Sequence, residues 1–122
     1  PCGLGGVLNE TTISLLNCKI IAGCANNQLA HDDLAERIHE MGILYAPDYV
    51  INSGGLVFAS SSYRGMNTHQ ILTEVNKLKD TLDKIFVLSK SKNVACNFIA
   101  NEMAEKILYG AEPAKDWMLE AI

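Results

Sequence analysis

The spacing of apolar residues changes about halfway along this chain, at residues 46–55. Before this stretch, short apolar runs alternate with short segments of helical spacing, an order typical of parallel strands joined by helices. After it, nearly every segment has the three- and four-residue spacing of an amphipathic helix. The pattern therefore predicts an α/β first half, residues 1–55, and a helical second half, residues 56–122.

Two segments in the first half have the composition of buried strands. Residues 19–24 are a nearly continuous apolar run. Residues 48–51 are mostly aromatic and β-branched, and Pro47, which cannot donate a ladder hydrogen bond, suits the start of that strand. The alternation with helices implies parallel pairing and right-handed crossovers. Two strands are few for a stable sheet, and the chain begins with Pro1 rather than Met, so we expect further strands upstream or a second chain.

Capping residues delimit the short helices that the first half predicts. Asn9 is a good N-cap for a two-turn helix ending near residue 16. Asp32 and Asp33 open a second helix, and Gly42 is placed as its C′ residue.

The second half predicts four helices. The first covers residues 56–63 and breaks at Gly65, and Asn67 with Gln70 forms a capping box for the next, long helix. Residues 97–109 predict a third, and residues 114–122, after Pro113, predict a fourth that carries Trp117. In the third helix we expect Ile99, Met103 and Ile107 to face inward. The long helix has one apolar stripe, which is either core or, less favoured, a subunit interface: Ile71, Val75, Leu78, Leu82, Ile85, Phe86 and either Ser89 or Leu88.

Composition restricts the class of protein. The chain of 122 residues is 48% hydrophobic and 20% charged, as in ordinary globular domains. Its net charge of −4 argues against a nucleic-acid surface. No apolar run approaches membrane-spanning length, and the first residues lack a signal-peptide pattern, so we expect a cytoplasmic protein without a membrane partner.

The four cysteines have no Cys-x-x-Cys pair and no histidine at ligand spacing, so no metal site is predicted. Cys18 and Cys24 flank or belong to an apolar run, where we expect buried free thiols. A thiol redox site stays open as an alternative, and it would require an exposed thiol of low pKa at Cys2 or Cys24.

Polar residues follow both predicted strands. Asn26, Asn27 and Gln28 are consecutive amides after the first strand, and they either bind the local backbone or pair with a ligand amide. Asn52 and Ser53, followed by two glycines, stand at a junction that is either a simple loop or part of a ligand-binding rim. The glycines at residues 3–6 do not form a dinucleotide fingerprint, because the third glycine and a preceding strand are missing.

Three motifs together resemble the glutamate/leucine/phenylalanine/valine dehydrogenases, and leucine dehydrogenases in particular. The motifs are PCGLGGVLN at residues 1–9, IAGCANNQL at residues 21–29 and YAPDYVINSGG at residues 45–55. Shorter matches at residues 84–86 and 103–105 extend the resemblance over nearly the whole chain. The resemblance implies an α/β fold with a partial Rossmann-like parallel sheet, so that residues 1–122 form the C-terminal part of an NAD-binding domain.

The same resemblance places important parts of the family's site outside this chain. The glycine fingerprint for the pyrophosphate, the acidic residue for the adenosine ribose and the catalytic lysines have no match here. We therefore expect no catalytic residue in this chain. None of its lysines lies in a family lysine motif: Lys19, Lys77, Lys79, Lys84, Lys90, Lys92, Lys106 and Lys115.

For the cofactor, the resemblance implies four residues. Cys2 and Gly3 match positions beside the nicotinamide ribose, with Gly3 standing where alanine is more usual. Asn26 matches an asparagine that contacts the nicotinamide portion, and Asn27 is its neighbour.

For the substrate, the resemblance implies three residues. Asn52 matches the asparagine of an Asn-Ala-Gly-Gly motif at the domain cleft, with Ser53 replacing the alanine. Leu56 and Ala59 match two helix positions that touch the substrate side chain, and their spacing puts them on one helix face. Both are apolar, which favours an aliphatic L-amino acid over glutamate.

The implied reaction is oxidative deamination of an L-amino acid to a 2-oxo acid and ammonia, with hydride transfer to NAD. On this interpretation a homo-oligomer is expected, and the isolated chain is inactive. The competing interpretation is a non-catalytic helical module for interaction or oligomerisation, with the long helix as its partner-binding face.

Overall fold

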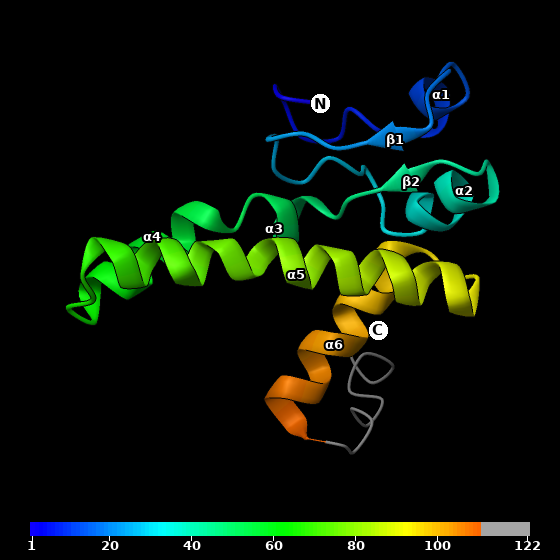
Figure 1. The fold of residues 1–122 in the computed structure, drawn as a ribbon. Helices are drawn as coiled ribbons and strands as arrows, with labels where there is room; N and C mark the ends of the chain where they lie inside the picture. Colours follow the sequence, from blue (N-terminus) through cyan, green and yellow to red (C-terminus); the bar gives the residue numbers. More distant parts are fainter. Residues whose placement is uncertain (111–122) are drawn as a thin grey trace, which may run out of the picture.

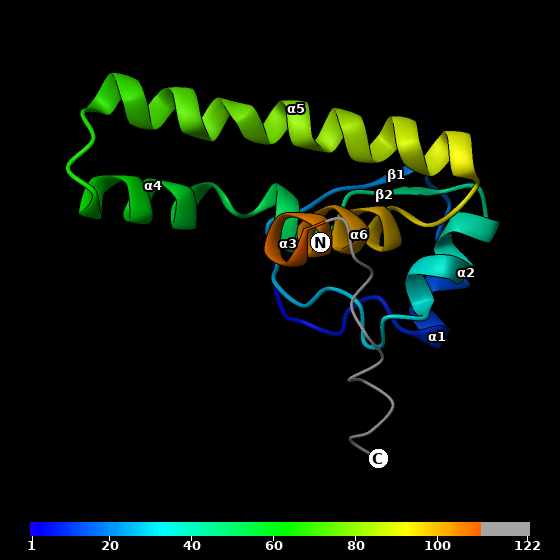
Figure 2. The same ribbon diagram turned by 90° about the horizontal axis from the view of Figure 1, so that it is seen from below.

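The computed structural model describes residues 1–110 (Figures 1 and 2). The predicted last helix, with Pro113 and Trp117, lies outside the described residues. The elements are, in chain order, α1 (Glu10–Ile13), β1 (Ile20–Ile21), α2 (Leu34–Glu40), β2 (Leu44–Tyr45), α3 (Asp48–Ile51), α4 (Gly54–Tyr63), α5 (Thr68–Lys92) and α6 (Cys96–Tyr109).

The two strands pair in parallel, as their alternation with helices predicted. Ile20 faces Leu44 and Ile21 faces Tyr45. An isolated parallel bridge between Leu8 and Leu29 continues the pairing toward the N-terminal segment. The α/β class, with a small parallel sheet and a mostly helical second half, is therefore confirmed.

The prediction of a strand at residues 48–51 is wrong, because this segment is helix α3. The second strand lies just before it, at Leu44–Tyr45. The chain turns at Pro47, whose carbonyl accepts hydrogen bonds from the backbone N–H groups of Val50 and Ile51, at 3.0 Å each. Local β-propensity was overridden by this turn and by the tertiary hydrogen bonds of Asp48 described below.

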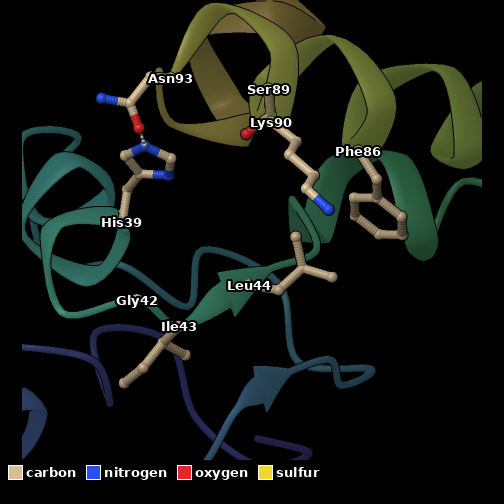
Figure 3. A pocket seen from close by; sticks show the side chains of 8 residues that line it. All are labelled: His39, Gly42, Ile43, Leu44, Phe86, Ser89, Lys90 and Asn93. Carbon is tan, nitrogen blue, oxygen red and sulfur yellow. Dashed lines mark hydrogen bonds between the residues drawn. The ribbon is translucent and has the colours of Figure 1, made fainter.

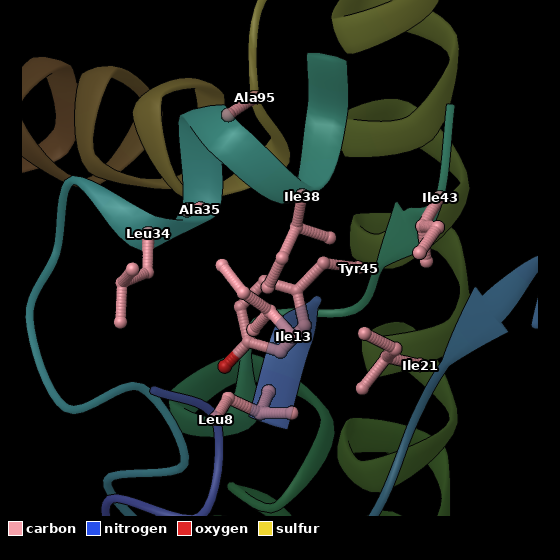
Figure 4. Close-up of a cluster of buried hydrophobic side chains, with 9 residues drawn as sticks. All are labelled: Leu8, Ile13, Ile21, Leu34, Ala35, Ile38, Ile43, Tyr45 and Ala95. Carbon is pink, nitrogen blue, oxygen red and sulfur yellow. The ribbon is translucent and has the colours of Figure 1, made fainter. Parts of the chain in front are cut away.

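One hydrophobic cluster joins the sheet to α1 and α2 (Figure 4). Ile13 from α1 and Ile38 from α2 are both fully buried and meet Tyr45 of β2 in its centre. Asn9 is the N-cap of α1, as predicted, because its side chain accepts from the N–H groups of Thr11 and Thr12. The Thr12 hydroxyl accepts in turn from the Asn9 N–H and completes a capping box. The two short helices are thereby held on the sheet.

Helices α4 and α5 run antiparallel and extend well beyond the sheet (Figures 1 and 2). Asn67 and Gln70 form the predicted capping box, with hydrogen bonds of 2.9 and 3.0 Å. The apolar stripe of α5 is buried or half-buried along its whole length, which favours the core interpretation. A Cβ added at Gly54 would lie within 4.0 Å of Leu78 and Val75, so α4 begins directly on this stripe.

Helix α6 packs across the end of α5 in a second cluster, formed by Ile85, Cys96, Ile99 and Ala100. Ile99 is fully buried, as predicted, but Ile107 is 83% exposed, so the expectation that it faces inward is wrong. The last turns of α6 extend past α5, and within residues 1–110 nothing covers them. Among these residues, no helix combines the length and the apolar character needed to span a bilayer.

Candidate functional site

Three segments meet where the parallel strands end. The loop of residues 22–29 follows β1, Asn52 ends the short helix after β2, and residues 1–7 run beside the loop. Asn52 donates from Nδ2 to the Ala25 carbonyl at 3.1 Å, and the Ala25 N–H donates to the Pro1 carbonyl at 3.1 Å. Ligands of open α/β sheets bind outside the carboxyl ends of the strands, so this is the expected place for a site.

A buried polar network beneath the loop fixes its position. Asp48, which is 8% exposed, accepts from the Gln28 backbone N–H and from the Tyr45 hydroxyl, both at 3.3 Å. The fully buried Gln28 side chain donates from Nε2 to the carbonyls of Gly23 and Ala25 at 2.8 Å. Burial, reinforced by the charge of Asp48, raises the pKa of Tyr45, which therefore remains a hydrogen-bond donor.

The sequence predicts only part of this network. Gln28 binds the local backbone, which is one of the two alternatives for the amides at residues 26–28, whereas the strand predicted at residues 48–51 implies no contact between Asp48 and Gln28. The Pro47–Asp48 pair at the start of a helix was the available signal, because a proline and an acidic residue are both favourable there.

Asn26 and Asn27 lie exposed on top of the loop. Neither side chain makes a hydrogen bond within residues 1–110, whereas the backbone of Asn27 is tightly held. Asn27 has a positive φ of 51°, and its carbonyl accepts from the Gly6 N–H at 2.7 Å. A Cβ at Gly5 would meet the carbonyls of Asn27 and Asn26 at 3.1 and 3.2 Å, so glycine there permits close approach of the two segments. The loop thus presents two free carboxamides on a fixed backbone.

The arrangement suits a ligand that carries an amide. A side-chain carboxamide offers a donor and an acceptor together, which complements another carboxamide. Gly3, in the segment that runs beside the loop, is exposed, and a Cβ there would touch nothing within 4 Å.

The expectation that Cys18 and Cys24 are buried is wrong, because both are exposed, as is Cys2. In the run at residues 19–24 only Ile21 is buried, because β1 packs against the core through one face only. Cys96 is buried, and all four thiols are free. No cluster of three or more His, Cys, Asp or Glu residues suited to a metal ion occurs in residues 1–110.

Leu56 and Ala59 lie on the first turns of α4, shortly after Asn52. Both are exposed, Leu56 to 74%. They extend the candidate site from the loops onto an apolar helix surface. The structure therefore brings Cys2, Gly3, Asn26, Asn27 and Asn52 to one edge of the sheet, with Leu56 and Ala59 next along the chain.

A cavity of about 380 Å³ lies elsewhere, between α2, β2 and α5 (Figure 3). The polar side chains that line it include groups that already make contacts within the fold. His39 Nε2 lies 3.4 Å from Asn93 Oδ1, and both His39 and Lys90 belong to the last turns of helices, where basic residues favour the helix dipole. A smaller cavity of about 200 Å³ adjoins the loop, lined by Asn27, Asp48 and Tyr49 among others.

Comparison with known proteins decides the family. The family model for glutamate/leucine/phenylalanine/valine dehydrogenases matches residues 1–112. The chain belongs to this dehydrogenase family. It is 44% identical over 106 residues to a leucine dehydrogenase of Bacillus cereus, and the match covers 87% of this chain and 29% of that protein. It is 38% identical over 120 residues to the leucine dehydrogenase of Geobacillus stearothermophilus, covering 98% of this chain and 33% of the relative.

A solved dehydrogenase structure has the same fold as this chain. The L-tryptophan dehydrogenase of Nostoc punctiforme superposes with a TM-score of 0.82 at 42% identity, over 87% of this chain and 33% of that one. The chain thus spans about a third of the length of the dehydrogenases that it matches. The resemblance drawn from the three motifs is confirmed.

Proposed function

We propose that this chain is the part of an NAD-dependent L-amino-acid dehydrogenase, of the leucine or branched-chain type, that holds the nicotinamide end of the cofactor and contacts the substrate side chain. The parent protein would convert an L-amino acid to a 2-oxo acid and ammonia. Residues 1–122 would form the C-terminal part of its dinucleotide-binding domain. The observation that carries the proposal is the meeting of three segments at Ala25, at the carboxyl edge of a parallel sheet, in a chain of this family.

The cofactor, when bound, would accept the hydride, and the residues of this chain would position it. Asn26 would pair with the nicotinamide carboxamide, and Asn27, Cys2 and Gly3 would line the ribose side. Because the buried Asp48 and Gln28 hold the loop in place, these groups would need little rearrangement on binding.

The substrate would lie between this edge and α4. Leu56 and Ala59 carry neither charge nor hydroxyl, so a side-chain carboxylate would lose its hydration there without gaining a partner. An aliphatic side chain would instead gain by burying apolar surface and excluding water from the reacting carbon. Asn52, tied to Ala25, would hold the junction between the cofactor loop and this helix.

The catalytic base would come from outside this chain. Four of its lysines are already paired with carboxylates on α5 and α6: Lys77, Lys79, Lys92 and Lys106. Among the lysines of residues 1–110, none follows a strand at the edge that carries the amides. A homo-oligomer and a cytoplasmic location belong to the same proposal.

The test is steady-state kinetics on the protein that contains this chain, with NAD and NADP each assayed against L-leucine, L-valine, L-tryptophan and L-glutamate. The proposal predicts the highest kcat/KM with NAD and an aliphatic substrate, and no turnover by the 122-residue chain alone. Turnover by the isolated chain, or preference for L-glutamate, would contradict it. Absence of any dehydrogenase activity in the parent would favour the non-catalytic helical module.

A further inference from the structure

Two exposed thiols, those of Cys2 and Cys24, lie beside each other at the edge that carries the candidate site. The proposed cofactor contacts use Cys2 only as a lining residue and do not use Cys24.

Backbone pairing brings the two residues together. Pro1 lies against the segment of residues 23–25, because its carbonyl accepts from the Ala25 N–H at 3.1 Å. Gly23 lies close against the same residue, because a Cβ added there would clash with the Pro1 backbone. The hydrogen bond from Ala25 joins the peptide unit between Pro1 and Cys2 to the peptide unit between Cys24 and Ala25, so the two cysteines flank one backbone bond. Residues in this position are near enough to reach the Cα separation of about 4.4–6.8 Å that disulfides require.

The environment of the two thiols favours attack by Cys2. The backbone N–H of Cys24 first, and its thiol second, lower the pKa of the Cys2 thiol. The same thiol contact, with the charge of the Cys2 thiolate, raises the pKa of Cys24. Cys2 is therefore the better nucleophile near neutral pH, with Cys24 placed beside it as the resolving thiol.

We propose that Cys2 and Cys24 form a reversible disulfide by exchange with a low-molecular-weight disulfide, and that this bridge weakens cofactor binding at the adjacent loop. In the first step the Cys2 thiolate attacks one sulfur of the small disulfide and releases one thiolate. The Cys24 thiol then loses its proton to solvent and attacks the Cys2 sulfur, releasing the second thiolate. The protein loses two electrons and two protons, and the small disulfide is reduced to two thiols.

The bridge acts on the site because both cysteines belong to the segments that form it. Cys2 precedes Gly3, and Cys24 lies two residues before Asn26. A disulfide fixes the distance and dihedral angle between its two residues, so its formation alters the spacing of these segments. The effect on the cofactor rests on the proposed function, whereas the formation of the bridge does not.

The test uses the reduced protein that contains this chain, incubated with oxidised glutathione and then alkylated and unfolded. Cleavage after Glu10 and Lys19 separates Cys2, Cys18 and Cys24 onto three peptides. We expect a peptide pair joined through Cys2 and Cys24 that dithiothreitol resolves. The variant Cys18→Ser should form the same bridge, because Cys18 is exposed but belongs to neither paired segment. The variant Cys24→Ser should instead retain glutathione on Cys2.

Glutathione that stays on Cys2 in the unaltered protein, with no joined peptide, would overturn the proposal. Isothermal titration of NAD provides the second readout, with roughly a tenfold rise in Kd expected for the bridged protein and full recovery on reduction. An unchanged Kd in the bridged form would overturn the effect on the cofactor. Failure of the reduced protein to bind NAD would contradict the proposed function, but it would not contradict formation of the disulfide.

Discussion

The side-chain amide of Asn52 donates a hydrogen bond of 3.1 Å to the backbone carbonyl of Ala25, across 27 residues of sequence. This bond joins the segment that follows β2 to the loop that follows β1. The same Ala25 is bonded through its N–H to Pro1, so one residue connects all three segments of the candidate site. Asn52 therefore connects the loop of residues 22–29 to the start of α4, and under the proposed function it would support the cofactor loop as well as contact the substrate.

Replacing Asn52 tests this connection. The variant Asn52→Ala removes the donor and should raise the KM for NAD about fivefold, the equivalent of one hydrogen bond of about 1 kcal/mol. Asn52→Asp should be at least as impaired, because a carboxylate cannot donate to the Ala25 carbonyl. The matched control is Asn76→Ala on the exposed face of α5, which should change neither KM nor kcat. An unchanged KM for NAD in both Asn52 variants would show that the bond does not support the loop.

The buried carboxylate of Asp48 is expected to contribute to stability. The variant Asp48→Ala leaves the Gln28 N–H and the Tyr45 hydroxyl without their acceptor, at a cost of about 1–3 kcal/mol in the free energy of unfolding. Denaturant titration of the protein that contains this chain measures the effect. Asp33→Ala serves as control, since Asp33 is exposed and makes no capping hydrogen bond, and it should change stability by less than about 0.5 kcal/mol. Equal stability of the two variants would refute a structural role for Asp48.

The ion pairs of Glu102 should make the stability of the folded protein depend on pH. The Lys106 side chain first, and Lys92 second, lower the pKa of Glu102 from 4.5 to about 2. Because the pKa is lower in the folded state, the stabilising contribution is complete above pH 4.5 and is lost as the pH falls toward 2. The difference in stability between the unaltered protein and Glu102→Gln should therefore be constant near neutral pH and shrink in acid.

The control for this pH series is Glu105→Gln on the same helix. Glu105 is exposed and forms no ion pair within residues 1–110, so its variant should show no such acid-dependent difference. Since the Glu102 network is at the surface, its effect should also weaken with added salt. A stability difference that grows in acid would contradict the assignment.

Ala59 is expected to limit the size of the substrate side chain. The variant Ala59→Leu adds three carbon atoms where the substrate would lie, and it should lower kcat/KM for L-leucine relative to L-alanine by about 10–200-fold. Ser60→Leu is the control, because Ser60 is exposed on another face of the same helix. The ratio of kcat/KM for L-leucine to kcat/KM for L-alanine is measured for each variant. Equal ratios in Ala59→Leu and Ser60→Leu would show that Ala59 does not contact substrate.

The sequence predicted elements that depend on local rules. The N-cap at Asn9 and the capping box at Asn67 are present because each uses only groups within three residues. Gly42 follows α2 with a φ of 73°, in the left-handed region where glycine is favoured. The stripe of α5 is likewise a repeated local pattern, long enough to be unambiguous.

The failures concern contacts between distant residues. The segment at residues 48–51 has strand composition, but Asp48 bonds to Gln28, 20 residues away, and the chain turns into a helix there. Cys24 and Ile107 have apolar neighbours in sequence, yet nothing within residues 1–110 covers them. The motifs identified the residues at the sheet edge, but the buried Gln28 and Asp48 that support them became visible only in three dimensions.

The most direct measurement is a crystal structure of the protein that contains this chain, with NAD and an aliphatic 2-oxo acid bound. The account predicts the nicotinamide carboxamide within hydrogen-bond distance of Asn26, and the aliphatic side chain against Leu56 and Ala59. A nicotinamide ring bound away from the loop of residues 22–29, with Asn26 in solvent, would contradict it.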